Sequence, residues 1–250
     1  MHEHPFAARL LKQGGLDKAD LKFFIAILGD DVSVGRGHDF VIDGVESRNL
    51  CFIKEGCAIR YRVLRNGKRQ IVNLLLPGDV IGLLGSFFER AAFSVTTTSS
   101  LVVNACSRES YTELCYARPQ FALALSWIAI HEAAMNAEHV VNLGRRTPIE
   151  RLSHFLLDVL NRLHTVNRAT ADRFILPISQ QIMADLLGLS VPHLNKMMQQ
   201  LRSSNLIADE SREVKILDVE SLKAIAQYQF RQLAPVPKRT ATSSVDVSCK

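Results

Sequence analysis

The chain has 250 residues, 47% of them hydrophobic and 22% charged, with a net charge of +5, which suits a globular protein of one large domain or two smaller ones. It holds no apolar run long enough to span a bilayer and no basic start followed by an apolar stretch, so we expect a cytoplasmic protein with no membrane partner. Its five cysteines form no CxxC pair, which argues against a zinc site or disulfide scaffold, and common catalytic motifs are missing, so we expect no enzyme.

The first half of the chain changes from a helical to a strand pattern. Apolar residues recur at helical intervals between about residues 5 and 28. From about residue 31 to 107, short runs rich in Val, Ile, Phe and Thr alternate with glycine-containing turns. The clearest hairpin joins Ala58–Leu64 to Arg69–Leu74 through Asn66-Gly67. Several short strands with such turns predict an antiparallel β jelly roll, and we assign residues 1–117 to it.

A single long helix is predicted from Pro119 to Leu143. Its first half is apolar almost all round, so it must be covered on several sides, by its own domain and by a second copy; a buried helix within a monomer is the alternative. Gly144 suits the end of this helix and Pro148 the start of the next. We therefore assign residues 118–145 to a dimerisation helix. Its predicted contact residues are Phe121, Leu125, Ile128, Met135 and His139.

The last part of the chain, residues 146–234, contains two short helices joined by a glycine turn. Ser179 is a natural N-cap for the first helix, Gly188 permits the turn, and Ser190 caps the second. This arrangement predicts a helix-turn-helix, which presents its second helix to the major groove. The alternative is an ordinary helical hairpin with a solvated polar face. The tail, residues 235–250, is rich in Pro, Ser and Thr, and we expect it to be disordered.

The second helix carries a face suited to DNA. Between Ser190 and Arg202 there is no acidic residue that would repel phosphate. Two strand candidates, Asn205–Ala208 and Val214–Leu217, follow it and predict a winged helix, although the turn between them is largely acidic. The candidate DNA contacts are Ser179, Gln181, Ser190, Val191, Pro192, His193, Asn195, Lys196, Gln199, Arg202 and Arg212.

The order of parts resembles the Crp/Fnr family of bacterial regulators. The resemblance is carried by Arg65–Ile71 and Leu76–Gly82 in the roll, by Leu143–Thr147 at the junction, and by Ala184–Lys196 in the helix-turn-helix, which we call the reader. The reader looks like that of the FixK-like and related branches. The resemblance implies an α+β fold: a cyclic-nucleotide-binding-type β-roll that senses an effector, a dimerisation helix and a winged helix. The function implied is a homodimeric transcription regulator that binds double-stranded DNA and works with RNA polymerase.

Within the reader, the resemblance places Ser179 and Gln181 on positions that hold phosphate, and Ser190, Val191, Pro192 and Lys196 on recognition positions. Members that read a guanine pair have Arg and Glu where this chain has Val191 and Pro192. The target sequence should therefore differ from theirs. We expect His193 and Asn195 to read bases.

The sensing half departs from the cAMP-binding members. Leu83 stands where they have a glutamate, and the phosphate position falls near Ala91-Ala92, with no arginine unless Arg90 is shifted into place. The cysteine cluster of iron–sulfur members is missing too, so neither cAMP nor an iron–sulfur cluster is supported. A pocket for a different small-molecule effector would involve Gly82, Leu83, Leu84, Gly85, Ser94, Val95 and Thr96. Three functions stay open: an effector-gated regulator, an effector-independent one, and a β-roll module acting on a protein partner.

Overall fold

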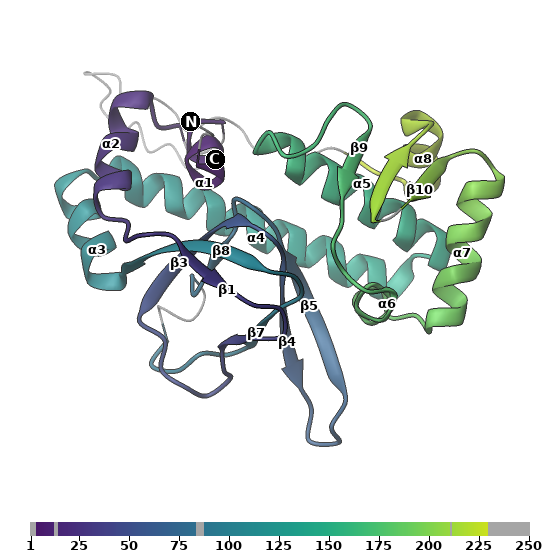
Figure 1. Cartoon of the computed structure of the whole chain (residues 1–250), viewed down its shortest axis with the longest axis horizontal. Helices are drawn as coiled ribbons and strands as arrows, with labels where there is room; N and C mark the ends of the chain where they lie inside the picture. The colour runs from purple at the N-terminus through teal and green to yellow at the C-terminus, as the bar shows by residue number, and fades with distance from the viewer. Residues whose placement is uncertain (1–3, 13–14, 84–87, 211, 230–250) are drawn as a thin grey trace, which may run out of the picture.

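The computed structural model describes residues 4–12, 15–83, 88–210 and 212–229. A β-roll lies between N-terminal helices and a C-terminal domain, with one long helix running behind both (Figure 1). None of the helices in these ranges is long and apolar enough to cross a membrane. The predictions for Leu84, Gly85 and the tail at 235–250 fall outside the described residues.

The elements are as follows. The helices are α1 (Pro5–Lys12), α2 (Lys18–Ala26), α3 (Arg108–Ala117), α4 (Gln120–Arg145), α5 (Pro148–Thr165), α6 (Gln180–Leu187), α7 (Val191–Ser203) and α8 (Val219–Ala226). The strands are β1 (Val32–Val34), β2 (Asp39–Val41), β3 (Asn49–Glu55), β4 (Ala58–Val63), β5 (Arg69–Leu75), β6 (Val80–Ile81), β7 (Ser94–Thr97), β8 (Leu101–Ser107), β9 (Arg173–Ile175), β10 (Ile207–Glu210) and β11 (Glu213–Ile216).

The N-terminal helical region forms two helices that close one end of the roll. Phe6 and Leu10 of α1 are fully buried. The ring of Phe6 lies 5.3 Å from that of Phe24 in α2 and 4.6 Å from that of Phe52 in β3, measured between centroids. This aromatic cluster fixes both helices to the roll.

Two four-stranded antiparallel sheets make the roll, in the orders β1-β8-β3-β6 and β2-β7-β4-β5. The β4–β5 hairpin forms where it was predicted, with Val63 opposite Arg69 and the turn that contains Asn66-Gly67 between them. Gly67 has φ +77°, which glycine adopts without strain. Inward-facing residues of both sheets, including Ile53 of β3 and Val95 of β7, form the core. The predicted jelly roll is confirmed.

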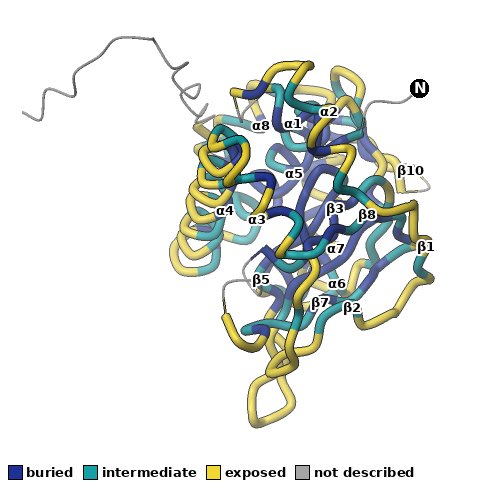
Figure 2. Tube along the Cα trace, turned by 90° about the vertical axis from the view of Figure 1, so that its left-hand side faces the viewer, coloured by how far each residue is buried: buried dark blue, intermediate teal, exposed yellow. Residues whose placement is uncertain are grey.

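Helix α4 packs on the roll with one face and leaves the other exposed (Figure 2). Phe121 and Ile128 are fully buried in the core that α1, α2 and α3 share with the roll. The prediction that these two residues contact a partner chain is therefore wrong. Leu125, Met135 and His139 are only partly exposed. Helical spacing identified the apolar positions of α4, but it could not show which of them the roll covers.

The C-terminal domain consists of α5 to α8 and the small sheet β10-β11-β9. Strand β9 begins at Arg173, and its Phe174 pairs with Val214 of β11. The domain shares one hydrophobic core with the outer face of the roll, where Ile71 and Leu74 of β5 join Leu186 and Leu187 of α6. The roll and the reader are therefore packed against each other.

A buried ion cluster also joins the roll to α1 and to α5. Asp79, in the turn between β5 and β6, accepts hydrogen bonds from Nη1 of Arg9 in α1 at 2.9 Å and from the backbone N–H of Leu76 at 2.8 Å. It also accepts one from Arg162 of α5. Burial alone would raise the pKa of Asp79, but the guanidinium groups of Arg162 and Arg9 hold that pKa below its ordinary value.

Candidate nucleic-acid interface

The helix-turn-helix is built by the capping residues that its sequence predicts. The Ser179 hydroxyl accepts the backbone N–H of Ile182 at 3.2 Å, which starts α6. Gly188 ends it in the left-handed conformation, with φ +64°. The Ser190 hydroxyl accepts the backbone N–H of His193 at 3.4 Å, which starts α7.

Helix α7 divides cleanly into a buried face and an exposed face. The buried face is apolar and consists of Leu194, Met197, Met198 and Leu201. The exposed residues include Pro192, His193, Asn195, Lys196, Gln199 and Arg202. Val191 is half-buried, so it is the least accessible of the predicted recognition residues. The exposed amide and cationic groups can pair with base edges or phosphates in a major groove.

Two predicted contacts are already held by acidic neighbours. Arg202 donates to Asp209 of β10 at 2.7 Å, so its guanidinium faces the wing. Gln181 donates from Nε2 to Asp185, one turn further along α6, at 2.7 Å. Each internal bond fixes the direction of its side chain but leaves N–H donors free for DNA, because a guanidinium has five donors and a primary amide has two.

The wing is as weakly basic as its sequence suggests. Lys215 of β11 lies 3.5 Å from Asp172, and Arg173 lies 3.9 Å from Glu213. Arg212 is exposed, at φ +80°, in the turn between β10 and β11. Among the described residues of the wing, Arg173 and Lys215 have acidic partners, whereas no ion pair is found for Arg212.

The candidate effector residues are largely engaged by the roll itself. Leu83 and Val95 are buried. The Ser94 hydroxyl accepts the backbone N–H of Asp43 at 3.0 Å, and the Thr96 hydroxyl donates to Asp39 of β2. Gly82 has φ +93°, and a Cβ atom there would meet the Asn49 carbonyl oxygen at 2.4 Å, so close backbone packing explains this glycine.

Arg90 does not replace the missing phosphate ligand in this conformation. It is exposed and donates from Nη1 to the Gly44 carbonyl at 3.2 Å. The arginine that does enter the roll is Arg60 of β4, which shares a cross-strand rung with Val95 of the core. Sequence reasoning missed it, because an arginine in an alternating strand ordinarily faces solvent.

Arg60 joins the roll interior to α4. Its Nη1 lies 3.6 Å from a carboxylate oxygen of Glu132, and both side chains are only 4% exposed. Burial raises the pKa of Glu132, and the charge of Arg60 acts against that shift. Neither Glu132 oxygen has a hydrogen-bond partner among the described residues.

Comparison with known proteins agrees with this architecture. A model of cyclic nucleotide-binding domains matches residues 32–117, and a model of Crp-like helix-turn-helix domains matches residues 150–225. The nitrogen fixation regulation protein FixK of Bradyrhizobium diazoefficiens is 30% identical over 211 residues, which cover 84% of this chain and 87% of that protein. The transcriptional activatory protein AadR of Rhodopseudomonas palustris is 30% identical over 75% of each chain.

The solved structure of FixK2 from Bradyrhizobium japonicum has the same fold. It superposes with a TM-score of 0.71 at 23% identity, over 78% of this chain and 96% of that one. The match to Crp-like helix-turn-helix domains shows that α6 and α7 are not an ordinary helical hairpin. The chain belongs to the Crp/Fnr family of transcription regulators.

Proposed function

We propose that this regulator is a cytoplasmic homodimer that binds a pseudo-palindromic operator and acts together with RNA polymerase. The observation that carries the proposal is the exposed face of α7, which is polar and free of acidic residues along its length. A β-roll module that acts only on a protein partner has no need of such a reader. The Crp-like helix-turn-helix match over residues 150–225 weighs against that alternative.

The exposed face of α4 supports the homodimer. Leu123 and Ile130 are each 54% exposed and Val140 is 70% exposed. The exposed residues between positions 122 and 141, none of them charged, are Ala122, Leu123, Ser126, Ala129, Ile130, Ala133, Ala134, Ala137, Val140 and Val141. A continuous apolar stripe at helical spacing favours packing against a second helix, and the small alanines allow close approach. A two-fold dimer would set two α7 helices about one DNA turn apart.

The reader residues take different roles in this proposal. Ser179, Gln181 and Lys196 hold phosphates and fix the register on DNA, whereas His193 and Asn195 read base edges. Asn195 suits this task because its amide can donate to and accept from an adenine edge at once. Its side chain is exposed on α7, outside the buried face that includes Leu194 and Met198.

We expect Asn195→Ala to weaken binding to the operator by about 1–3 kcal/mol and to relax its sequence preference. Lys196→Ala, the matched phosphate variant on the next residue, should weaken binding to operator and random DNA by similar factors. Titration of both duplexes by fluorescence anisotropy measures the difference. Equal loss on the two duplexes for Asn195→Ala would contradict its role in base reading.

One observation favours DNA binding without an added effector. Arg60 and Glu132 already link the roll interior to α4, so this contact between roll and helix does not require a bound small molecule. We therefore propose that the purified dimer binds its operator unaided, with cAMP having no effect. A dimer that needs a small molecule for sequence preference would contradict this proposal and support effector gating.

A further inference from the structure

We propose that the tip of the β4–β5 hairpin is a second DNA-contacting surface, which binds phosphates flanking the part of the operator that α7 reads. The hairpin projects away from the body of the roll (Figure 1), and its tip is exposed (Figure 2). Four cations lie on the hairpin at or near its turn: Arg62, Arg65, Lys68 and Arg69. Between Arg62 and Arg69 there is no acidic residue. This inference rests on the proposed function.

The hairpin is fixed to the helix-turn-helix at the start of β5, next to its turn. Arg69 at the start of β5 forms a 2.6 Å ion pair with Asp185 of α6. The same carboxylate accepts the 2.7 Å hydrogen bond from Gln181. Behind this contact, Ile71 of β5 shares a hydrophobic core with Leu187 of α6. The hairpin therefore lies beside the face of α6 that carries a proposed phosphate contact.

The cations at the tip are the ones available to a partner. Arg62 is paired with Asp43 at 3.3 Å, and Arg69 is paired with Asp185. Arg65 and Lys68 are exposed, and no ion pair joins either of them to another described residue. The turn is closed by a 2.8 Å hydrogen bond from the Leu64 N–H to the Lys68 carbonyl, so the backbone that carries both side chains is held in place.

Distance and charge favour DNA as the partner. A strand advances by about 3.3 Å per residue, so Lys68 and Arg65 lie within roughly 15 Å of the Arg69–Asp185 contact. A duplex held at Gln181 carries one negative charge per roughly 1.7 Å of its axis. It would therefore bring phosphates within reach of the tip. An acidic surface on a protein partner would suit the same cations, but it would not explain why the hairpin is joined to the reader.

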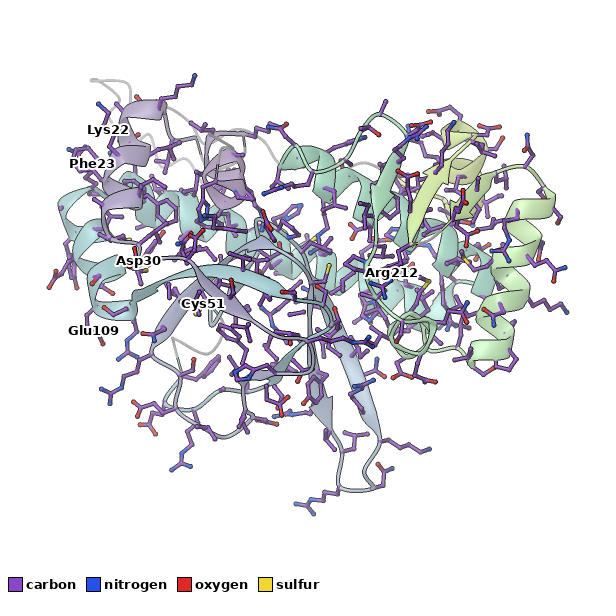
Figure 3. All side chains as sticks on the ribbon, viewed as in Figure 1. Lys22, Phe23, Asp30, Cys51, Glu109 and Arg212 are labelled. Atoms are coloured by element: carbon purple, nitrogen blue, oxygen red, sulfur yellow. The ribbon has the colours of Figure 1, made fainter. Side chains whose placement is uncertain are left out.

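The test compares the double variant Arg65→Gln, Lys68→Gln with wild type and with the control Lys18→Gln, Lys22→Gln. The control removes two exposed lysines from α2, and Figure 3 shows Lys22 at the left-hand end of the molecule, far from Arg212 of the wing. Binding is measured on the minimal operator and on an operator extended by about one DNA turn on each side. The thermal unfolding midpoint shows whether each variant is folded.

On the extended operator we expect the hairpin variant to bind on the order of tenfold more weakly than wild type. A dimer would lose four phosphate contacts, so the slope of log affinity against log salt should fall by about 3–4. On the minimal operator the hairpin variant, the control and wild type should bind alike. The random-sequence duplex of extended length should show the same loss as the extended operator, because phosphates carry no sequence.

Equal binding of wild type and the hairpin variant to the extended operator, with an equal salt slope, would overturn the inference while leaving the proposed function in place. Unchanged DNA binding with loss of polymerase recruitment would overturn it in favour of an acidic protein partner. Failure of the wild type to prefer any sequence would overturn the proposed function, and this inference with it.

Discussion

Asp79→Asn is expected to lower the free energy of unfolding by about 3–5 kcal/mol. The carboxylate lies between two guanidinium groups, those of Arg9 and Arg162, and all three side chains are at most 10% exposed. The variant keeps the shape of Asp79 and removes its charge, so buried positive charge is left uncompensated at the junction of α1, the roll and α5. The 3.5 Å ion pair between Arg162 and Asp158 remains and limits the loss.

Chemical denaturation at neutral pH measures this effect, with Asp30→Asn as the matched control because Asp30 is exposed. The pH dependence gives a second readout. The folded-state pKa of Asp79 lies below its ordinary value of 3.8. Its stabilisation is therefore complete above that value and is lost as the pH falls below it. The stability difference between wild type and Asp79→Asn should shrink in acid. A constant difference from pH 7 to pH 3 would contradict the role assigned to its charge.

Ile130→Glu or Val140→Glu is expected to convert the dimer to a monomer and to weaken operator binding by about 100-fold or more. Each substitution would place two carboxylates close together across the two-fold axis and bury them in an apolar interface. Two readers that bind as one unit lose most of their joint affinity when they are separated.

The control for these variants is Ile25→Glu on α2, where another exposed isoleucine lies outside the proposed interface. Analytical ultracentrifugation gives the oligomeric state, and circular dichroism shows that the fold is kept. A dimer that persists in both α4 variants would mean that the two copies associate through another surface.

Local features of the fold were predictable because their physical causes are local. Ser179, Gly188 and Ser190 begin and end helices through caps that involve the next few residues. The Asn66-Gly67 turn fixes the register of its hairpin in the same way. These features, together with the order of the parts, were enough for the jelly roll and the winged helix.

Features that depend on distant partners were missed. Arg60 and Arg9 look like solvent-facing cations in the sequence, yet they meet Glu132 and Asp79, which lie 70 or more residues away along the chain. The exposed face of α4 was misassigned for the same reason, since only the packed roll decides that Phe121 is inside. Strand β9 depends on pairing with β11, which a short apolar segment does not reveal by itself.

Two copies of this chain are expected to read a two-fold symmetric DNA site through α7. Selection of random duplexes by the purified protein without any added effector, followed by sequencing, tests this claim most directly. We predict enrichment of an inverted repeat whose half-site centres lie about one DNA turn apart. Enrichment of a single unrepeated half-site, or of no sequence with or without a panel of small molecules, would contradict the claim.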